Sequence, residues 1–572
     1  MISIKDEIAK ILEDNIDGLN GDEILESIEI PADPKMGDYA FPCFRLAKQF
    51  RKAPPVIAQE ITEKIVDRSI FEKVENVNAY INMFISKEYL IENTLREVAD
   101  KQENFGSSDL GAGKKVIVEF SSPNIAKPFH IGHIRSTVIG NSIYKIYDFL
   151  GYDTVRINHL GDYGTQFGKM IVAFRKWGNE DDVKKEPIKT LLGYYVKFHD
   201  EAEKDPSLED EARATFTKLE NGEAEETRLW EWFREESLKE FTRVYKMLGI
   251  EFDSYAGESF YSDKMAPVVK ELEDKGLLVE SRGAKIVDLE EFGMAPALIT
   301  KSDGSTLYIT RDIAAAIYRK QHYNFYKNLY IVASQQNLHF QQWIKVLELM
   351  GYDWGKDCIH IPFGLVSLEE GTMSTRHGRV VFLEEVLRKA VEKTKDIILT
   401  RGVNTDLADD VSKQVGIGAV IFQELANNRI KDYTFSWDKI LNFEGETGPY
   451  VQYTHARAAS ILRNGENEFK EAKKDFDNVK FEYIISEAAY MLSKLIYGFP
   501  DVVKESAERY EPSIITRYIV DVAQAFNRFY HDEHILVENV EEKKAKLLLV
   551  YAAMQTIRNG LKLLGIDAPE RM

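Results

Sequence analysis

The stretch KVIVEFSSPNIAKPFHIGHIRSTVIGNS, residues 115–142, passes from a short apolar run through a polar turn into a tetrad with a histidine at each end. Its first apolar residues, Val116, Ile117 and Val118, are consecutive and β-branched, which is typical of a strand buried on both faces. Further along, apolar residues recur with the spacing of a helix: Ile131, Ile134, Val138 and Ile139. The stretch therefore predicts a strand, a loop and a helix, in that order.

A junction of this kind is a natural binding site for a nucleotide. The first backbone amides of a helix point outward without partners and lie at the positive end of the helix dipole, so phosphate binds there readily. His130 and His133 are three residues apart, one turn of a helix, and are expected to project to the same side. Gly132 has no side chain, so a flat base can approach its backbone.

The two histidines by themselves allow three interpretations. They can be hydrogen-bonded residues of a buried helix. They can bind zinc, although such a site needs three or four ligands and no cysteine or His/Glu cluster lies nearby in the sequence. They can also stabilise charge on a phosphoryl group through their ring N–H groups. Motifs elsewhere in the sequence are needed to distinguish these three interpretations.

Composition limits the class of protein. A chain of 572 residues is too long for one hydrophobic core and predicts roughly three or four domains. With 44% hydrophobic and 29% charged residues it resembles an ordinary globular protein. No apolar stretch reaches the roughly eighteen residues of a membrane span, and the N-terminus lacks the apolar region of a signal peptide, so we expect a cytoplasmic protein without a membrane partner.

Cysteine content and charge restrict the chemistry further. Cys43 and Cys358 are the only cysteines, which argues against a disulfide framework and a thiolate zinc site, and we expect no structural metal. A formal net charge of −20 ordinarily argues against a polyanionic partner. Binding depends on a local basic face, however, and such a face can coexist with an acidic remainder.

Changes of pattern along the chain predict three domains in an α/β protein. Residues 1–108 mix helical and alternating patterns and predict a small α+β domain. Residues 109–444 alternate apolar strands with helices, which favours a parallel sheet with crossovers, and the charged helical stretch at about 179–245 is interpreted as an insertion. Within this domain, residues 307–319 are interpreted as a strand followed by a helix. Residues 445–572 predict a helical bundle.

Several motifs together resemble one family. The H-I-G-H tetrad at 130–133, the M-S-T-R loop at 373–376 and the helical C-terminal domain resemble class I aminoacyl-tRNA synthetases, most closely the arginyl-tRNA synthetases. Further stretches that look like this family are SSPNIAKPFHIGHIRST, HLGDYGTQFG, LYITRDI, VASQQNLH, MSTRHGRVV, YVQYTHARAASIL and GIDAPERM. The resemblance implies a Rossmann-like catalytic domain, an N-terminal domain that contacts tRNA and a C-terminal anticodon-binding domain.

The same resemblance implies a reaction in two steps. Arginine attacks the α-phosphate of ATP, bound with Mg²⁺, to give arginyl-adenylate, and the arginyl group then moves to the terminal ribose of tRNA(Arg). The attacking carboxylate is already an anion, so the first step needs positioning and charge stabilisation but no general base. The family leads us to expect that activation requires tRNA and that the enzyme is a monomer.

Residues for ATP follow from the matched motifs. His130 and His133 are expected to donate hydrogen bonds to phosphate oxygens, with Gly132 against adenine. His339, like His159, falls in a family motif near the nucleotide, but both histidines can also be merely structural.

The second motif departs from the family's usual lysine-containing loop. It reads Thr372, Met373, Ser374, Thr375 and Arg376, so both lysines are missing. Met373 and Ser374 are still expected to contact ATP. Lys127, three residues before the tetrad, is our candidate for the replacement charge, with Arg376 and Arg379 as alternatives. The alternative interpretation of Lys127 is an exposed loop lysine, but we favour the functional one.

An arginine pocket has to neutralise a guanidinium group, for which carboxylates are the best partners. The resemblance implies that Asp312 and Glu119 are the acidic contacts and that Tyr308 lines the pocket. Asp312 can alternatively cap a helix that begins at Ile313. The remaining polar groups expected to hold the substrate are Ser122, Asn124 and Gln336.

Three residues of the C-terminal region are expected to bind tRNA. Tyr453 and Tyr530 lie among polar residues, as stacking on unpaired RNA bases requires, although core packing explains each tyrosine equally well. Met572 is expected at the anticodon loop if the family pattern carries over.

Three rivals remain at this stage. A class I synthetase specific for glutamine or glutamate is the nearest. A small-molecule adenylyltransferase is less compatible with the long helical C-terminal region. An inactive relative that only binds tRNA is disfavoured because both histidines and Gly132 are present.

Overall fold

The computed structural model describes residues 4–66, 69–302, 307–368, 381–400 and 405–572. The chain forms two compact units, and the C-terminal helices contribute to both. The first unit consists of Met1–Phe105, Arg457–Pro500 and Asp521–Ile557, and the second of Gly106–Ala456, Asp501–Val520 and Arg558–Met572.

The N-terminal part of the first unit is built on a three-stranded antiparallel sheet in the order β1-β3-β2. The strands are β1 (Tyr39–Pro42), β2 (Phe71–Val77) and β3 (Tyr80–Ile85). Its helices are α1 (Ile4–Glu13), α2 (Gly21–Ser27), α3 (Ala47–Phe50), α4 (Pro54–Lys64) and α5 (Lys87–Lys101). Ile81 and Met83 of the central strand are fully buried, so this sheet carries its own core.

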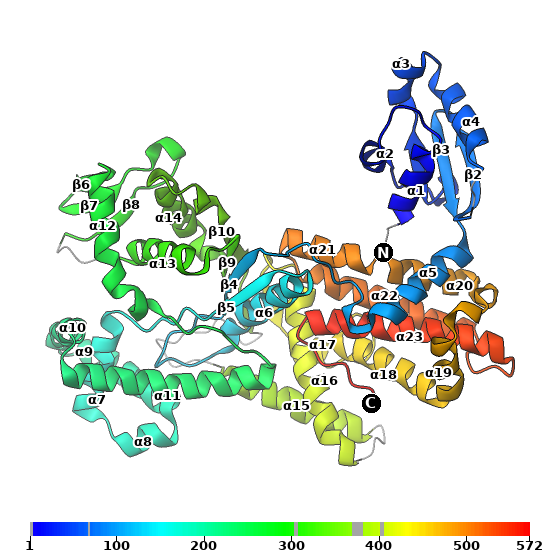
Figure 1. Cartoon of the computed structure of the whole chain (residues 1–572). Coiled ribbons are helices and arrows are strands. Elements are labelled where there is room, and N and C mark those ends of the chain that lie inside the picture. Colours follow the sequence, from blue (N-terminus) through cyan, green and yellow to red (C-terminus); the bar gives the residue numbers. More distant parts are fainter. Residues whose placement is uncertain (1–3, 67–68, 303–306, 369–380, 401–404) are drawn as a thin grey trace. The chain divides into compact units, whose positions relative to one another are not determined.

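The second unit contains a four-stranded parallel sheet in the order β10-β9-β4-β5 (Figure 1). Its strands are β4 (Lys115–Glu119), β5 (Asp153–Ile157), β9 (Lys327–Ala333) and β10 (Cys358–Phe363). Val116, Ile117 and Val118 of β4 are completely buried, which confirms the strand predicted from the opening stretch.

The connections of this sheet create a switch point between β4 and β9. From β4 the chain continues through α6 (Ile134–Phe149) to β5 on one side. From β9 it continues through α14 (Asn337–Leu349) to β10 on the other side. Ligands of open parallel sheets bind outside the carboxyl ends of the strands at such a point. The fold thus places the end of β4, and the polar turn that follows, where a ligand is expected.

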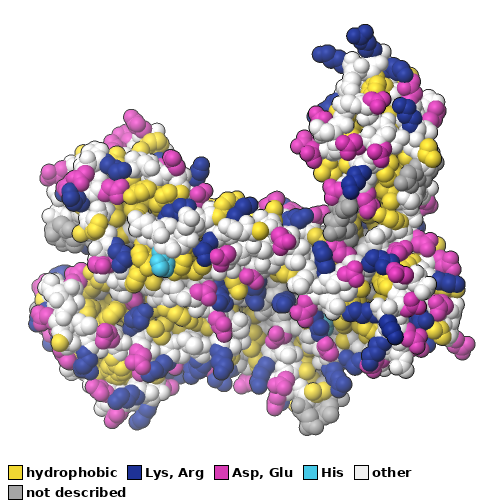
Figure 2. Space-filling view, in the orientation of Figure 1, with side chains coloured by type: hydrophobic (Ala, Val, Ile, Leu, Met, Phe, Trp, Pro, Cys, Tyr) yellow, Lys and Arg dark blue, Asp and Glu magenta, His cyan; other side chains and the backbone are white. Residues whose placement is uncertain are grey.

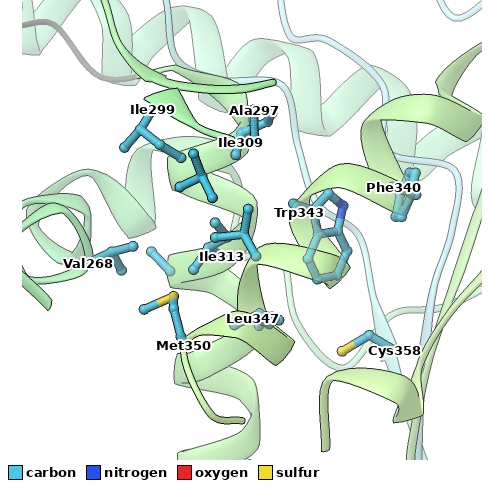
Figure 3. Packing of buried hydrophobic residues seen from close by; sticks show 14 of the residues in the cluster. Val268, Ala297, Ile299, Ile309, Ile313, Phe340, Trp343, Leu347, Met350 and Cys358 are labelled. Atoms are coloured by element: carbon cyan, nitrogen blue, oxygen red, sulfur yellow. The ribbon is translucent and has the colours of Figure 1, made fainter. Parts of the chain in front are cut away.

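Between β5 and β9 the chain adds two substructures. The charged stretch after β5 is helical: α7 (Thr165–Trp177), α8 (Glu180–Lys185), α9 (Pro187–Ala202), α10 (Ser207–Glu220) and α11 (Ala224–Leu248). The second substructure contains α12 (Met265–Asp274), α13 (Tyr308–Tyr323) and an antiparallel sheet of β6 (Leu278–Ser281), β7 (Ala284–Val287) and β8 (Ala297–Thr300). Figure 3 shows the core that this substructure shares with α14 and the parallel sheet, in which Ile313 of α13 and Trp343 and Leu347 of α14 pack together and are fully buried.

The prediction of a strand at the start of residues 307–319 is wrong. Helix α13 already begins at Tyr308, with Leu307 at its N-cap position. Ile309 and Ile313 are four residues apart and both enter the core in Figure 3, so burial of one helical face overrides the strand-like start. Asp312 is therefore the fifth residue of a helix, and the alternative that it caps one is also wrong.

The remaining elements are mostly helical. A short parallel pair joins β11 (Val366–Leu368) and β12 (Tyr433–Phe435). In the second unit, α15 (Leu383–Thr400) and α16 (Thr405–Ala426) pack together. This unit also contains α17 (Trp437–Ile440) and most of α21 (Phe499–Arg509). The other helices are α18 (Gly448–Asn464), α19 (Glu466–Lys474), α20 (Glu487–Tyr497), α22 (Ser513–Asp532) and α23 (Val540–Leu563). Among the described residues, no helix is long and apolar enough to span a membrane.

Candidate active site

The two histidines form a tight turn between β4 and α6. His130 occupies the cap position of a single 3-10 turn, Ile131–His133, and α6 begins at Ile134. The two imidazole centroids are 4.0 Å apart, so the rings do lie on the same side. Gly132 N–H donates to Nδ1 of His130 over 3.1 Å, and His130 N–H donates to Nδ1 of His133 over 3.2 Å. Because Nδ1 of His130 accepts a hydrogen bond, the proton of its neutral ring lies on Nε2.

Burial keeps both imidazoles neutral. It lowers the pKa of His130 to about 4. It also lowers the pKa of His133 to about 3, and there the neighbouring His130 and the positive charge of Lys127 act in the same direction. At neutral pH each ring is therefore an uncharged hydrogen-bond donor, the form suited to stabilising an oxyanion without exchanging a proton with it.

The turn before the histidines holds an unusual backbone. Ser121, Ser122 and Ala126 have φ angles of 69°, 45° and 56°, in the left-handed region that non-glycine residues seldom occupy. Ser121 Oγ is hydrogen-bonded to Tyr245 OH over 2.8 Å, and Ala126 N–H donates to Ser237 Oγ over 2.8 Å. Helix α11 thus holds the turn in place, and backbone of this kind is concentrated at ligand sites.

A second turn, after β5, packs against the first. Ile125 N–H donates to the carbonyl of Gly161 over 3.2 Å, and Ser122 Oγ accepts a hydrogen bond from His159 N–H over 3.2 Å. A Cβ atom at Gly161 would collide with the side chain of Asn124, so glycine is required for this close approach. The structure therefore brings Ser122, Asn124 and His159 together, with Asn124 exposed.

Glu119, the last residue of β4, is held by a buried cation. Its Oε2 lies 2.5 Å from Nη1 of Arg319, whose side chain is fully buried. Nη2 of Arg319 also lies 3.3 Å from Nδ1 of His159. A carboxylate has about four acceptor positions, so this ion pair fixes Glu119 without exhausting its capacity.

Asp312 and Glu258 form the acidic side of the site. Asp312 Oδ2 lies 2.5 Å from Nε2 of His339. The pKa of Glu258 is raised to about 7, mainly by burial and also by the charges of Asp312 and Asp162, although Arg311, 3.3 Å away, opposes the shift. Sequence reasoning missed Glu258, because nothing in GESFY distinguishes this residue from a surface carboxylate.

The other predicted residues of the site are distributed as follows. Lys127 Nζ lies 5.4 Å from the centre of the Tyr195 ring on α9. Tyr308 is the first residue of α13 and is 64% exposed. Gln336 is exposed in the turn directly after β9, at the switch point. Met373, Ser374 and Arg376 lie outside the described residues, as do Thr372, Thr375 and Arg379.

The chain on both sides of the stretch 369–380 is attached next to the histidine turn. Ile131 N–H donates to the carbonyl of Val381 over 3.1 Å, and Leu383 N–H donates to the carbonyl of Phe129 over 2.9 Å. Before the stretch, the carbonyl of Gly364 accepts a hydrogen bond from Nη1 of the buried Arg135 over 3.1 Å. The described residues that flank this stretch, Gly364 on one side and Val381 and Leu383 on the other, thus lie against the histidine turn and the start of α6.

The residues predicted to bind tRNA lie in both units. Tyr530 of the first unit is exposed, and the Arg457 guanidinium lies 5.4 Å from its ring centre. Tyr453 of the second unit is 36% exposed. Met572, also of the second unit, packs against a cluster that contains Ile398 and Val411. Among the described residues, no group of three or more His, Cys, Asp or Glu side chains is arranged to hold a metal ion.

Three family descriptions match successive parts of this chain. "Arginyl tRNA synthetase N terminal domain" matches residues 3–85, "tRNA synthetases class I (R), catalytic domain" matches residues 94–437, and "DALR anticodon binding domain" matches residues 451–572.

Individual proteins agree with these matches. The arginine--tRNA ligases of Clostridioides difficile (strain 630) and Halothermothrix orenii are 60% and 58% identical to the chain over 572 residues, which is 100% of the chain and of each relative. The crystal structure of arginyl-tRNA synthetase from Plasmodium falciparum, at 26% identity, superposes with a TM-score of 0.76 over 100% of this chain and 99% of that one. The arginyl-tRNA synthetase of Thermus thermophilus, at 23% identity, shares the fold with a TM-score of 0.79 over 100% of both chains. The chain therefore belongs to the arginyl-tRNA synthetase family of class I aminoacyl-tRNA synthetases.

Proposed function

We propose that the residues gathered at the carboxyl ends of β4 and β9 carry out the reaction of this family, in which arginine is joined to tRNA(Arg) through arginyl-adenylate. The observation that carries the proposal is the juxtaposition of a neutral histidine pair at the start of α6 with three carboxylates in the same sheet-end region, the buried Glu119 and the partly buried Asp312 and Glu258. The histidine pair suits a phosphate, and the carboxylates suit a guanidinium. The first step of the reaction requires ATP and arginine, which carry these two groups, to be bound at the same time.

In the first step the carboxylate oxygen of arginine forms a bond to the α-phosphorus of ATP. The bond from that phosphorus to the β-phosphate oxygen breaks, and pyrophosphate leaves with the electron pair. No proton has to move. His130 and His133 donate ring N–H groups to the α-phosphate oxygens, and these bonds strengthen as negative charge develops there. Gly132 lies against adenine, and Mg²⁺ enters with ATP as part of the substrate.

Lys127 supplies positive charge toward the departing pyrophosphate in this proposal. Its influence on the pKa of His133 supports a position close to the reacting phosphates, and its contact with Tyr195 keeps it at the edge of the site. Arg376 remains the alternative, and Met373 and Ser374 remain proposed contacts to ATP.

Arginine binds on the acidic side, with Asp312 and Glu258 facing its guanidinium and Tyr308 lining the pocket. Glu119, Ser122, Asn124 and Gln336 hold the end of the substrate that bears the amino and carboxylate groups, and His339 positions Asp312 near the nucleotide. The short contact between Asp312 and His339 and the strained turn at Ser122 support this arrangement, because both fix polar groups before the substrate arrives.

In the second step the terminal ribose hydroxyl oxygen of tRNA(Arg) forms a bond to the arginyl carbonyl carbon. The bond from that carbon to the phosphate oxygen breaks, AMP leaves with the electron pair, and the hydroxyl proton is released to solvent. We propose that Tyr453, Tyr530 and Met572 contact the tRNA, with residues 445–572 as the anticodon-binding domain, residues 1–108 as a second tRNA-contacting domain and residues 109–444 as the catalytic domain. We also propose that activation requires tRNA, and that the enzyme works as a cytoplasmic monomer.

The function is tested by ATP–pyrophosphate exchange with each amino acid, in the presence and absence of tRNA(Arg). Exchange is expected with arginine alone among the amino acids and only when tRNA is present. Exchange with glutamine or glutamate in place of arginine would refute the assignment. Exchange with arginine in the absence of tRNA would leave the specificity intact and remove the proposed tRNA requirement.

The affinity for arginine is expected to depend on pH through Glu258. Its pKa of about 7 in the free enzyme means that it is largely protonated below that value, and a bound guanidinium favours the ionised form. Binding then releases a proton, so the KM for arginine should be constant above pH 7 and rise toward about tenfold per pH unit below it. The KM for ATP serves as the control. A Glu258→Gln variant should bind arginine more weakly at pH 8 and lose this pH dependence; persistence of the same slope would exclude Glu258 as its origin.

A further inference from the structure

A large cavity in the second unit lies away from the histidine turn. Its volume is about 1010 Å³, and it is bordered by the ends of α6 and α11, by α15 and α16, and by the chain from Arg558 to Ala568. Lys145 of α6 lines it twelve residues beyond His133, about 18 Å along the helix axis. The cavity is therefore separate from the proposed ATP and arginine site.

The lining of this cavity is basic in a protein of net charge −20. Its acidic residues are Glu392, Asp410 and Asp567. Its basic residues, twice as numerous, are Lys145, Lys246, Arg388, Lys413, Arg558 and Lys562. Figure 2 shows basic and acidic side chains interspersed over the visible face of the molecule. Of the six basic residues of the cavity, Arg388, Lys413 and Arg558 form ion pairs with Glu384, Asp410 and Glu570. The local basic face in this acidic protein is therefore provided mainly by the lysines.

Two of these lysines form no ion pair with any residue that the structure describes. Among the described residues, no carboxylate lies within 4.0 Å of Nζ of Lys145 or Lys246, whereas Arg388 pairs with Glu384 over 2.7 Å. The pKa of Lys145 is lowered by burial and also by the positive charges of Lys562 and Arg156. An anion in the cavity would relieve this repulsion.

The wall that carries Lys562 is fixed to the helix that carries Lys145. Ser142 Oγ of α6 donates to the carbonyl of Leu563 over 3.0 Å. Gly565 follows with a φ of +73°, and a Cβ atom there would lie 2.7 Å from Nδ2 of Asn141. The segment beyond is held by the buried Gln452, whose Nε2 donates to the carbonyl of Asp567 over 2.8 Å. The basic groups are therefore presented by a preformed scaffold.

We propose that this cavity binds phosphates of the tRNA(Arg) backbone, with Lys145, Lys246 and Lys562 as the principal contacts. The cavity, at about 1010 Å³, is much larger than a single phosphate group, and its lysines on three separate elements can meet successive phosphates along a strand. A lysine that contacts a phosphate acts as a point charge and reads no base, so this site would position the tRNA without contributing sequence specificity. The inference rests on the aminoacylation function and adds a contact region to it.

The test compares a Lys145→Gln/Lys246→Gln double variant with a Lys270→Gln control. Lys270 lies on α12 of the same unit, is exposed and pairs with Asp274 over 2.8 Å. The Kd for a tRNA(Arg) transcript is measured over a range of salt concentrations. For the double variant we expect about tenfold weaker binding, and a slope of log Kd against log salt smaller by about 0.7–0.9 for each lost contact. The KM values for ATP and arginine should stay unchanged, and the control should match the wild type.

The possible results separate this inference from the function on which it rests. If the wild type does not charge tRNA(Arg), the function itself is wrong. If the wild type charges tRNA while the folded double variant keeps the wild-type Kd and salt slope, the cavity is not a tRNA contact. Inorganic phosphate or pyrophosphate that binds to the wild type and not to the double variant, with tRNA binding unchanged, would assign the cavity to a free anion and overturn the proposal.

Discussion

Replacement of His133 by alanine is expected to lower the rate of arginyl-adenylate formation by about 10²–10³-fold, equivalent to about 2.7–4 kcal/mol, the usual effect of removing one donor to a developing oxyanion. The ring is neutral, since burial lowers its pKa to about 3, and it is oriented by the hydrogen bond from His130 N–H to its Nδ1. Alanine removes a fixed donor that water cannot replace in the same position.

The measurement is single-turnover formation of adenylate with saturating ATP and arginine. A His322→Ala variant is the matched control, because His322 is an exposed residue of α13 outside the site. The Kd for arginine and the thermal stability of the His133→Ala variant should remain close to those of the wild type. A loss of tenfold or less would show that the imidazole serves the structure of the turn. Because both rings titrate far below neutrality, their contribution to the rate should not change between pH 6 and 8.

Replacement of Arg319 by methionine is expected to lower the free energy of unfolding by about 3–5 kcal/mol, as is typical when one member of a buried ion pair is removed. Arg319 is fully buried, and Glu119, whose side chain is 9% exposed, would keep its charge without a partner. The same change should raise the KM for arginine, since Arg319 holds the carboxylate at the end of β4 in one position.

Chemical denaturation measures the stability of this variant. An Arg228→Met variant is the control, because Arg228 and Glu225 form an exposed pair on α11, and such pairs contribute only about 0–1 kcal/mol. If Arg319→Met does not fold, Arg319→Lys preserves the charge and should lose less stability while still raising the KM for arginine. A loss below 1 kcal/mol for Arg319→Met would mean that another group compensates the charge of Glu119. An unchanged KM for arginine would show that Glu119 does not contribute to the arginine pocket.

Local patterns were sufficient for the strand, the turn and the helix around the tetrad. Three consecutive β-branched residues formed the buried strand β4, and the helically spaced Ile134, Val138 and Ile139 are buried in α6, a helix covered on nearly all sides. The pattern failed at Leu307 to Asp312, where a few residues fit a strand and a helix equally well. The helix forms because it lets both Ile309 and Ile313 pack into the core. The residues that make up that core are distant in the sequence, so the local pattern could not predict it.

The sequence by itself determined the family, because its motifs occur in a fixed order and each needs specific residue types, and it placed the histidine pair at a strand–helix junction. Only the tertiary structure decided the protonation state of that pair, since burial depends on which elements cover it. Only the fold could pair Glu119 with Arg319, reveal Glu258 as a carboxyl group with a pKa of about 7, and gather lysines of α6, α11 and the C-terminal segment around one cavity. Each of these properties depends on desolvation or charge proximity between residues far apart along the chain, which no local pattern records.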